Sequence, residues 1–303
     1  MKPLLILLLL VFFFSACSSE PSPDRLERIS YVSELGGPER DYYVYLPVGY
    51  DSGPDKTWPV LMFLHGNGER GNAKEDLPFT MVHGPLFEAW SQKKELPFIL
   101  IVPQLHMFGL DTLGIDYLTN RDVSKVPQRL EVGTPEREPD FGTPYPMSGE
   151  THITEFSETL PLSEFGWDRV QNDLLGMIDN VLENYNSDSR RVYLSGLSYG
   201  GFGTWYMGSH YPDRFAAINP VVGWGHPSLM PTIAEHNLPV WVFAGGRDKT
   251  VDKKYFFAGV NLLEELGHSE VIFTIHEDMG HDAWRRIYEG DDVYTWLLKH
   301  KIN

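Results

Sequence analysis

The sequence predicts an α/β fold in which helices cover both faces of a central, mostly parallel sheet. Short apolar runs end in turn residues, as buried strands do, and amphipathic segments separate the later runs. Strands that alternate with helices form parallel βαβ units, which place helices on both faces of one sheet. A chain of 303 residues is long enough for one large domain of this kind.

The expected strands follow in chain order. Residues 41–47 alternate in polarity, which is typical of an antiparallel strand with one solvated face. Residues 58–66 and 96–104 are continuous apolar runs, as expected of central strands that are covered on both faces. Four further strands are expected at residues 190–196, 215–223, 238–246 and 269–276.

Helical patterns separate the later strands. Apolar residues recur at helical spacing in residues 167–185, and residues 253–267 end on a glycine placed like a helix C-cap. Another helix is expected to begin just after Ser198, and residues 292–301 form the last helical segment.

Residues 105–166 interrupt this alternation. They show no strong period and contain several prolines, many charges and scattered aromatic residues. A loop this long inside a compact domain is usually functional or disordered. We expect an insertion that leaves the sheet after Gln104 and forms a partly ordered cap over the site, with a surface excursion remote from the site as the alternative.

The N-terminus is typical of an export signal. Lys2 precedes an uninterrupted apolar run at residues 4–14, and small residues follow at a cleavage position. The run is too short for a comfortable membrane span. Cys17 is the only cysteine in the chain, and it stands where a bacterial lipoprotein signal places its lipid-modified residue, although Phe14 occupies a position where leucine is usual.

These features predict the organisation of the chain. Residues 1–16 are expected to be a signal peptide, residues 17–27 a lipid-anchored tether and residues 28–303 the catalytic domain. The protein would then be a membrane-anchored lipoprotein on the periplasmic or cell-surface side. An ordinary signal peptide with an incidental cysteine is the alternative.

The charge balance excludes some partners. The formal net charge is −17, whereas contacts to nucleic-acid phosphates need clustered Lys and Arg. The same acidity argues against adsorption to anionic lipid, so the expected membrane contact is through a lipid on Cys17 alone.

The most informative motif is Gly-Leu-Ser-Tyr-Gly at residues 196–200, between a predicted strand and a predicted helix. That context is the one that a nucleophile elbow requires. The flanking glycines allow a tight turn that lifts Ser198 above the C-terminal edge of the sheet. The turn also places the Tyr199 N–H at the start of a helix, where N–H groups lack partners and favour negative charge.

A serine hydroxyl needs a base, and the base needs an orienting carboxylate. In proteins with a nucleophile elbow, the acid follows the serine in the chain and the histidine follows the acid. Asp248 lies just past a predicted strand end, with Asp252 as the alternative acid, although Asp252 is better placed to cap a helix. His281 lies in the loop after the last strand, with His276 at the strand end as the alternative base.

The segment Phe-Leu-His-Gly-Asn-Gly-Glu-Arg-Gly at residues 63–71 follows another predicted strand. This is where a second backbone donor of an oxyanion hole should lie, and the main-chain N–H of Asn67 is the candidate. His65 precedes the turn and is expected to be structural. A glycine-rich turn without a catalytic role is the alternative.

Neither a cofactor nor a metal is expected. There is no cysteine pair, and His276 and His281 are five positions apart rather than on one helical face. No dinucleotide fingerprint is present, and residues 65–71 lack the Lys-Ser/Thr of a phosphate loop.

In combination, these segments resemble the secreted α/β-hydrolases described as predicted esterases or peptidases, which are related to polyhydroxybutyrate depolymerases and to feruloyl and acetyl-xylan esterases. The resemblance runs from about Tyr43 to Leu298, apart from residues 105–166, and its motifs read "LMFLHGNGERG", "RRVYLSGLSYGGFG", "LPVWVFAGGRDKTVD" and "GHDAW". It implies that Ser198 is the nucleophile, Asp248 the acid and His281 the base. The long insertion departs from the family and leaves the substrate open.

The expected function is therefore a serine esterase that cleaves a carboxylic ester outside the cytoplasm by an acyl-enzyme mechanism. A carbohydrate-linked or aryl/acyl ester is the expected substrate. A serine peptidase of similar fold is the alternative, and the absence of a propeller-like repeat favours the ester. A catalytically silent binding lipoprotein is a further alternative, against which the complete serine, acid and histidine set argues.

Overall fold

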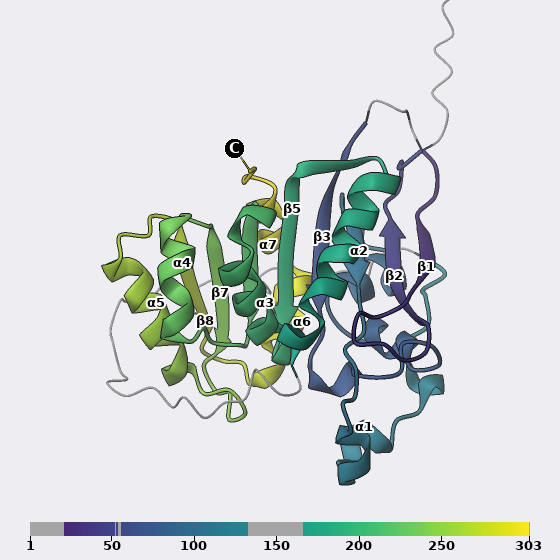
Figure 1. The fold of residues 1–303 in the computed structure, drawn as a ribbon, viewed down its shortest axis with the longest axis horizontal. Helices are drawn as coiled ribbons and strands as arrows, with labels where there is room; N and C mark the ends of the chain where they lie inside the picture. The colour runs from purple at the N-terminus through teal and green to yellow at the C-terminus, as the bar shows by residue number, and fades with distance from the viewer. Residues whose placement is uncertain (1–20, 52, 54–55, 133–165, 303) are drawn as a thin grey trace, which may run out of the picture.

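The computed structural model describes residues 21–51, 53, 56–132 and 166–302. These residues form an eight-stranded sheet in the order β1-β2-β4-β3-β5-β6-β7-β8 (Figure 1). The β1–β2 and β2–β4 pairs are antiparallel and the other pairs are parallel, which confirms the predicted α/β architecture. The strands span Arg25–Tyr31 (β1), Arg40–Leu46 (β2), Trp58–Leu64 (β3), Ile99–Val102 (β4), Ser187–Leu197 (β5), Ala217–Val221 (β6), Val240–Gly245 (β7) and Val271–His276 (β8).

Helices cover both faces of the sheet (Figure 1). One face carries α2 (Gln171–Asn184), α3 (Tyr199–His210), α4 (Met230–Glu235) and α5 (Phe256–Glu265), and the other carries α6 (Trp284–Glu289) and α7 (Asp292–Leu297). A short helix, α1 (Asp116–Thr119), projects beyond one end of the sheet (Figure 1). Single-turn segments flank these elements at Asn67–Glu69 (η1), Leu77–Met81 (η2), Phe87–Ser91 (η3), Leu110–Leu113 (η4), Val123–Lys125 (η5), Trp167–Val170 (η6), Pro212–Arg214 (η7), Pro227–Leu229 (η8), Lys253–Tyr255 (η9) and His281–Ala283 (η10).

The two faces of the sheet bury separate apolar cores. Every residue of β3 is buried, as its uninterrupted apolar sequence predicts. Strand β2 is antiparallel to its neighbours as expected, but the expected solvated face is wrong, because all seven of its residues are buried. Tyr42 and Val44 join the core under α2 to α5, whereas Tyr43 and Tyr45 join the core under α6 and α7.

The ordered fold begins earlier than expected. Strand β1 starts at Arg25, so the last three residues of the expected tether belong to the sheet. The signal peptide at residues 1–16 and the proposed lipid site at Cys17 lie outside the described residues. Within the described part of the chain, no helix has both the length and the apolar character needed to cross a bilayer.

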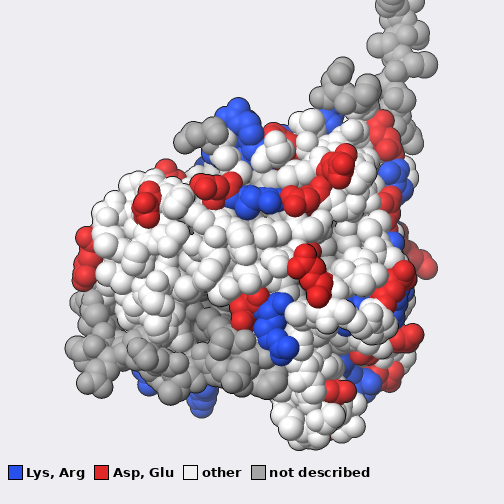
Figure 2. Space-filling view, in the orientation of Figure 1, with Lys and Arg blue, Asp and Glu red and all other residues white. Residues whose placement is uncertain are grey.

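The insertion is described up to residue 132, and its remainder at residues 133–165 lies outside the described residues. Leu105, the first residue assigned to the insertion, is fully buried in the core. Leu118 and Val126 are also buried, so this first part packs against the domain. Figure 2 shows acidic and basic side chains interspersed on one face, with no continuous basic stripe among the residues coloured there.

Candidate active site

Ser198 occupies a strained turn between the end of β5 and the start of α3. Its backbone has φ 51° and ψ −115°, a conformation that residues with a side chain rarely adopt. Glycines on either side permit the turn. A Cβ atom on Gly200 would lie 1.9 Å from the Leu64 carbonyl oxygen, and one on Gly196 would lie 2.3 Å from the Gly200 carbonyl oxygen. The local structure is therefore the nucleophile elbow that the sequence predicts.

Three predicted residues from three separate loops meet in one hydrogen-bonded chain. Ser198 Oγ lies 2.9 Å from His281 Nε2, and His281 Nδ1 lies 2.6 Å from Asp248 Oδ2. Both distances are within hydrogen-bond range. Because the loops follow the C-terminal ends of β5, β7 and β8, the parallel sheet brings all three side chains to one edge. The arrangement is that of a serine–histidine–acid triad.

The Asp248 carboxylate is fixed independently of the histidine. Its side chain has no solvent exposure, and Oδ1 accepts hydrogen bonds from the backbone N–H groups of Thr250 and Val251 at 2.7 and 2.9 Å. Oδ2 is left to face His281, whose side chain is 23% exposed. The acid is therefore held rigidly in the protein, and the histidine is accessible from solvent.

The alternative acid and base occupy other positions. Asp252 caps η9, where its carboxylate accepts a hydrogen bond from the Lys254 N–H, as expected of a helix cap. His276 is buried, and its ring stacks on Phe243. Burial lowers the pKa of His276 to about 4, helped by the nearby charge of Arg286. Neither residue belongs to the hydrogen-bonded chain of Ser198.

Residues 66–70, here called the oxyanion loop after the predicted role of Asn67, approach the serine at Gly66. A Cβ atom on Gly66 would lie 2.9 Å from Leu197 Cδ1 and 3.7 Å from the Ser198 Cβ, so a side chain here would force Leu197 to shift. The Gly66 carbonyl accepts a hydrogen bond from His65 Nδ1 at 2.6 Å. Since the peptide bond is trans, the N–H of Asn67 points the opposite way from that carbonyl.

His65 is structural, as expected. Its Nε2 accepts a hydrogen bond from the Leu105 N–H at 2.9 Å, so Nδ1 carries the ring proton that is donated to Gly66. Burial lowers the pKa of His65 to about 3, which keeps the ring neutral. The neutral ring therefore ties the oxyanion loop to the start of the insertion.

Tyr199 and Asn67 are the two predicted oxyanion donors: Tyr199 follows the serine directly in the chain, and Asn67 follows Gly66, which approaches the serine. Within the described residues, no hydrogen bond to a backbone carbonyl is recorded for the Tyr199 N–H at the first position of α3. Such an N–H at a helix start is available to a developing negative charge.

Sequence reasoning missed the role of Arg70. Its side chain is completely buried, Nε donates to Asn67 Oδ1 at 2.5 Å, and Nη1 donates to the His106 carbonyl at 2.9 Å. Its guanidinium lies 4.5 Å from the centroid of the Tyr199 ring. A charged residue in a glycine-rich loop suggests exposure, and only the folded contacts show that Arg70 joins the two oxyanion segments.

The insertion contacts the oxyanion loop directly. Asn67 Nδ2 donates to Tyr117 Oη at 2.9 Å, and Arg121 Nη1 donates to the carbonyls of Gly68 and Arg70 at 2.9 and 2.6 Å. The described part of the insertion is therefore next to the oxyanion loop. The cap itself stays a prediction, because residues 133–165 lie outside the described residues.

Trp284 packs against the histidine of the triad. Its ring lies 5.1 Å from that of His281, edge to face, and 5.3 Å from that of His83. Trp284 and His83 both line a cavity of about 420 Å³ between η3 and α6. This part of the site had no signal in the sequence beyond the aromatic residue three positions after the predicted base.

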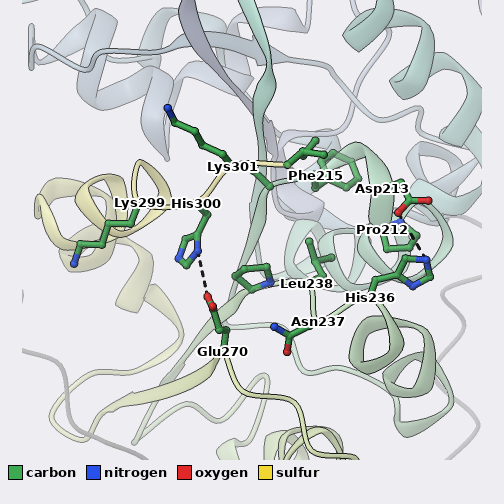
Figure 3. A pocket seen from close by; sticks show the side chains of 13 residues that line it. Pro212, Asp213, Phe215, His236, Asn237, Leu238, Glu270, Lys299, His300 and Lys301 are labelled. Carbon is green, nitrogen blue, oxygen red and sulfur yellow. Dashed lines mark ion pairs between the residues drawn. The ribbon is translucent and has the colours of Figure 1, made fainter.

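A second cavity, of about 520 Å³, lies at the opposite end of the sheet (Figure 3). It is bordered by the residues that precede β6, β7 and β8 and by the C-terminal segment, with an ion pair between His300 and Glu270 at 3.3 Å. None of the triad residues lines it. It is therefore separate from the candidate active site.

Comparisons with known proteins show similarity over parts of the sequence. Residues 167–258 match the prolyl oligopeptidase family. Acetylxylan esterase A from Emericella nidulans is 34% identical over 90 residues, which cover 25% of this chain and 29% of that protein. Iron(III) enterobactin esterase from Dickeya dadantii is 27% identical over 180 residues, which cover 50% of this chain and 38% of that protein. The chain thus spans less than two-fifths of the length of these curated relatives.

Solved structures extend the similarity to nearly the whole chain. A thermostable esterase superposes with a TM-score of 0.60 at 24% identity, covering 91% of this chain and 63% of that one. A ferulic acid esterase superposes with a TM-score of 0.52 at 15% identity, covering 91% of this chain and 97% of that one. Together with the strand order and the nucleophile elbow, these similarities show that the chain has the α/β-hydrolase fold.

Proposed function

We propose that this chain is a serine hydrolase that cleaves carboxylic esters through an acyl-enzyme on Ser198. The observation that supports the proposal is the continuous hydrogen-bonded chain from Ser198 through His281 to Asp248. His281 Nε2 takes the hydroxyl proton while Ser198 Oγ attacks the ester carbonyl carbon. The same proton then passes to the departing alcohol as the carbon–oxygen bond of the ester breaks.

Water completes the cycle. His281 takes a proton from a water molecule, which attacks the acyl-enzyme carbonyl, and returns the proton to Ser198 Oγ as the acid leaves. In both halves of the reaction, the carbonyl oxygen becomes negatively charged. In the proposed mechanism, the N–H groups of Asn67 and Tyr199 donate to that oxygen, and a single such donor contributes about 3 to 4 kcal/mol.

An ester linked to a carbohydrate or an aryl acid is the proposed substrate. The names of the similar proteins support this, since they include an acetylxylan esterase and a ferulic acid esterase. A peptidase is the second candidate, because residues 167–258 match the prolyl oligopeptidase family. The complete triad geometry argues against a binding protein without catalysis.

A panel of matched substrates tests the proposal. We expect acetyl-xylan or feruloyl esters to be cleaved with a kcat/KM at least 100-fold above that of amides with the same acyl group. A fluorophosphonate probe should label the wild type and not S198A. Equal labelling of both proteins would exclude Ser198 as the nucleophile, and faster amide cleavage would favour the peptidase.

We also propose that the protein is exported and anchored through a lipid on Cys17. The apolar run at residues 4–14 and the lone cysteine after it support this location. Ser198 would then act outside the cytoplasm, where polymeric esters are accessible.

A further inference from the structure

Glu69 of the oxyanion loop is a buried acid that the proposed mechanism does not use. Its side chain is only 13% exposed. Its Oε2 atom is inaccessible to solvent, and no hydrogen-bond partner of that atom is found among the described residues. An ionised carboxylate in such a place is unfavourable unless it is paired.

The carboxyl group lies beside the nucleophile. The side-chain position that Gly66 leaves empty is 3.1 Å from Glu69 Oε2 and 3.7 Å from the Ser198 Cβ. The acid and the nucleophile therefore border the same point, on the side of the serine where the oxyanion loop approaches. A charge at Glu69 would act on the reaction through a water-poor region, where electrostatic effects are strong.

The nearest titratable neighbours give Glu69 no counter-charge. His65 Nδ1 lies 3.8 Å from one carboxyl oxygen, and His83 Nε2 lies 4.0 Å from the other. Burial lowers the pKa of His65 to about 3 and that of His83 to about 4, the latter helped by the charge of Arg285, so both rings are neutral near pH 7.

The surrounding arginines make their hydrogen bonds to other groups. Arg121 bonds to two carbonyls of the oxyanion loop, and Arg70 bonds to Asn67 and the His106 carbonyl. Burial raises the pKa of Glu69 to about 7, against the opposing effects of backbone hydrogen bonds and of the charge of Arg121. The acid is therefore neutral below that pH and ionised above it.

We propose that Glu69 controls the Ser198 reaction electrostatically: its neutral acid form permits, and its carboxylate form opposes, the negative charge on the tetrahedral intermediate. This inference rests on the proposed function of Ser198. The intermediate carries its charge near the N–H groups of the oxyanion loop, so a second negative charge in the same loop repels it. Glu69 acts through the electrostatic field of its charge and does not contact the substrate.

The test compares the pH dependence of kcat/KM in wild type and E69Q, which keeps the side-chain shape and removes the charge. We expect the kcat/KM values of the two proteins to agree within twofold at about pH 6. At about pH 8.5, E69Q should be at least tenfold faster. E75Q is the matched control, since Glu75 is an exposed carboxylate six residues away in the chain, and it should follow the wild type at every pH.

The inference would be overturned if the ratio of kcat/KM in E69Q to kcat/KM in the wild type did not change with pH. It would also be overturned if E69Q and E75Q had the same pH dependence of kcat/KM. A uniform loss of activity in E69Q would indicate a structural role instead. If E69Q does not fold, E69A serves as the second variant in the same comparison.

An infrared measurement separates this inference from the proposed function. In the S198A background, the spectrum at about pH 6 should contain a carboxylic-acid carbonyl band that is absent in S198A/E69Q. Hydrolysis by S198A would refute the function and leave the band in place. Absence of the band in S198A would refute the role of Glu69 whether or not Ser198 is the nucleophile.

Discussion

Replacing Asp248 by asparagine should reverse the polarity of the hydrogen bond that orients His281. The Asp248 Oδ1 atom accepts two backbone hydrogen bonds, from Thr250 and Val251 at 2.7 and 2.9 Å. An asparagine of the same shape must place its amide oxygen at the position of Oδ1, because its amide nitrogen cannot accept the two backbone hydrogen bonds. Its NH₂ group then faces His281 Nδ1, which must become the acceptor.

The histidine is thereby locked into the wrong tautomer. Nε2 carries the ring proton and can no longer take the proton of Ser198, which lies 2.9 Å away. We expect kcat to fall by about 10⁴, which corresponds to roughly 5 kcal/mol of transition-state stabilisation. KM for a small ester should change little, since Asp248 is fully buried and does not touch the substrate.

Steady-state kinetics on a short acyl ester give the measurement, with circular dichroism as the check on folding. Asp252→Asn is the matched control, because that carboxylate caps η9 and lies outside the triad. It should retain activity within about threefold. If D248N kept activity within tenfold of the wild type, Asp248 would not be the acid that orients His281.

Four further outcomes follow from the structure. Gly200→Ala should lower the free energy of unfolding in urea by at least about 3 kcal/mol, since the new Cβ would collide with a β3 carbonyl. Gly176→Ala in α2 is the control: its Cβ would meet nothing within 4 Å, and it should raise the free energy of unfolding by about 1 kcal/mol. Arg121→Met should lower kcat at least about tenfold with KM within twofold, because the oxyanion loop loses two hydrogen bonds to its carbonyls. The raised pKa of Glu69 favours the fold at low pH, and this stability is lost as pH rises through about 7; E69Q should recover roughly 3 kcal/mol in unfolding at pH 8.5. Cys17→Ser should move an active enzyme from the membrane to the soluble fraction of the host, and an unchanged distribution would exclude the lipid anchor.

The central strands, and the end of the sheet at which the triad loops meet, could be predicted because both follow from short sequence patterns and their order in the chain. Continuous apolar runs are required wherever a parallel strand is covered on both faces, as β3 is. Parallel strands also bring their C-terminal ends to one edge, so the loops with Ser198, Asp248 and His281 could be placed together from chain order alone.

The parts that could not be predicted depend on contacts between distant segments. Strand β1 is polar at its start and lies at the edge of the sheet, so its pattern resembles a tether. Arg70 and Glu69 are charged residues in a short loop, and sequence patterns indicate that such residues are solvated. Their burial follows from packing against His83 and against His106 of the insertion, which are 14 and 36 positions further along the chain.

The point where the chain enters the sheet fixes how an anchored molecule would face its surroundings. Arg25 pairs with Leu46 at the end of β2. Tyr43, at the middle of β2, pairs with Val102 at the C-terminal end of β4, and this end of the parallel strands carries the triad loops. The entry point is therefore at the edge of the sheet remote from Ser198. Seven residues lie between Cys17 and Arg25, so the distance between these two residues is roughly 30 Å at most. A lipid on Cys17 would hold the domain close to the bilayer with its catalytic edge turned outward, toward polymers in the surrounding medium and away from the ester bonds of the membrane's own lipids.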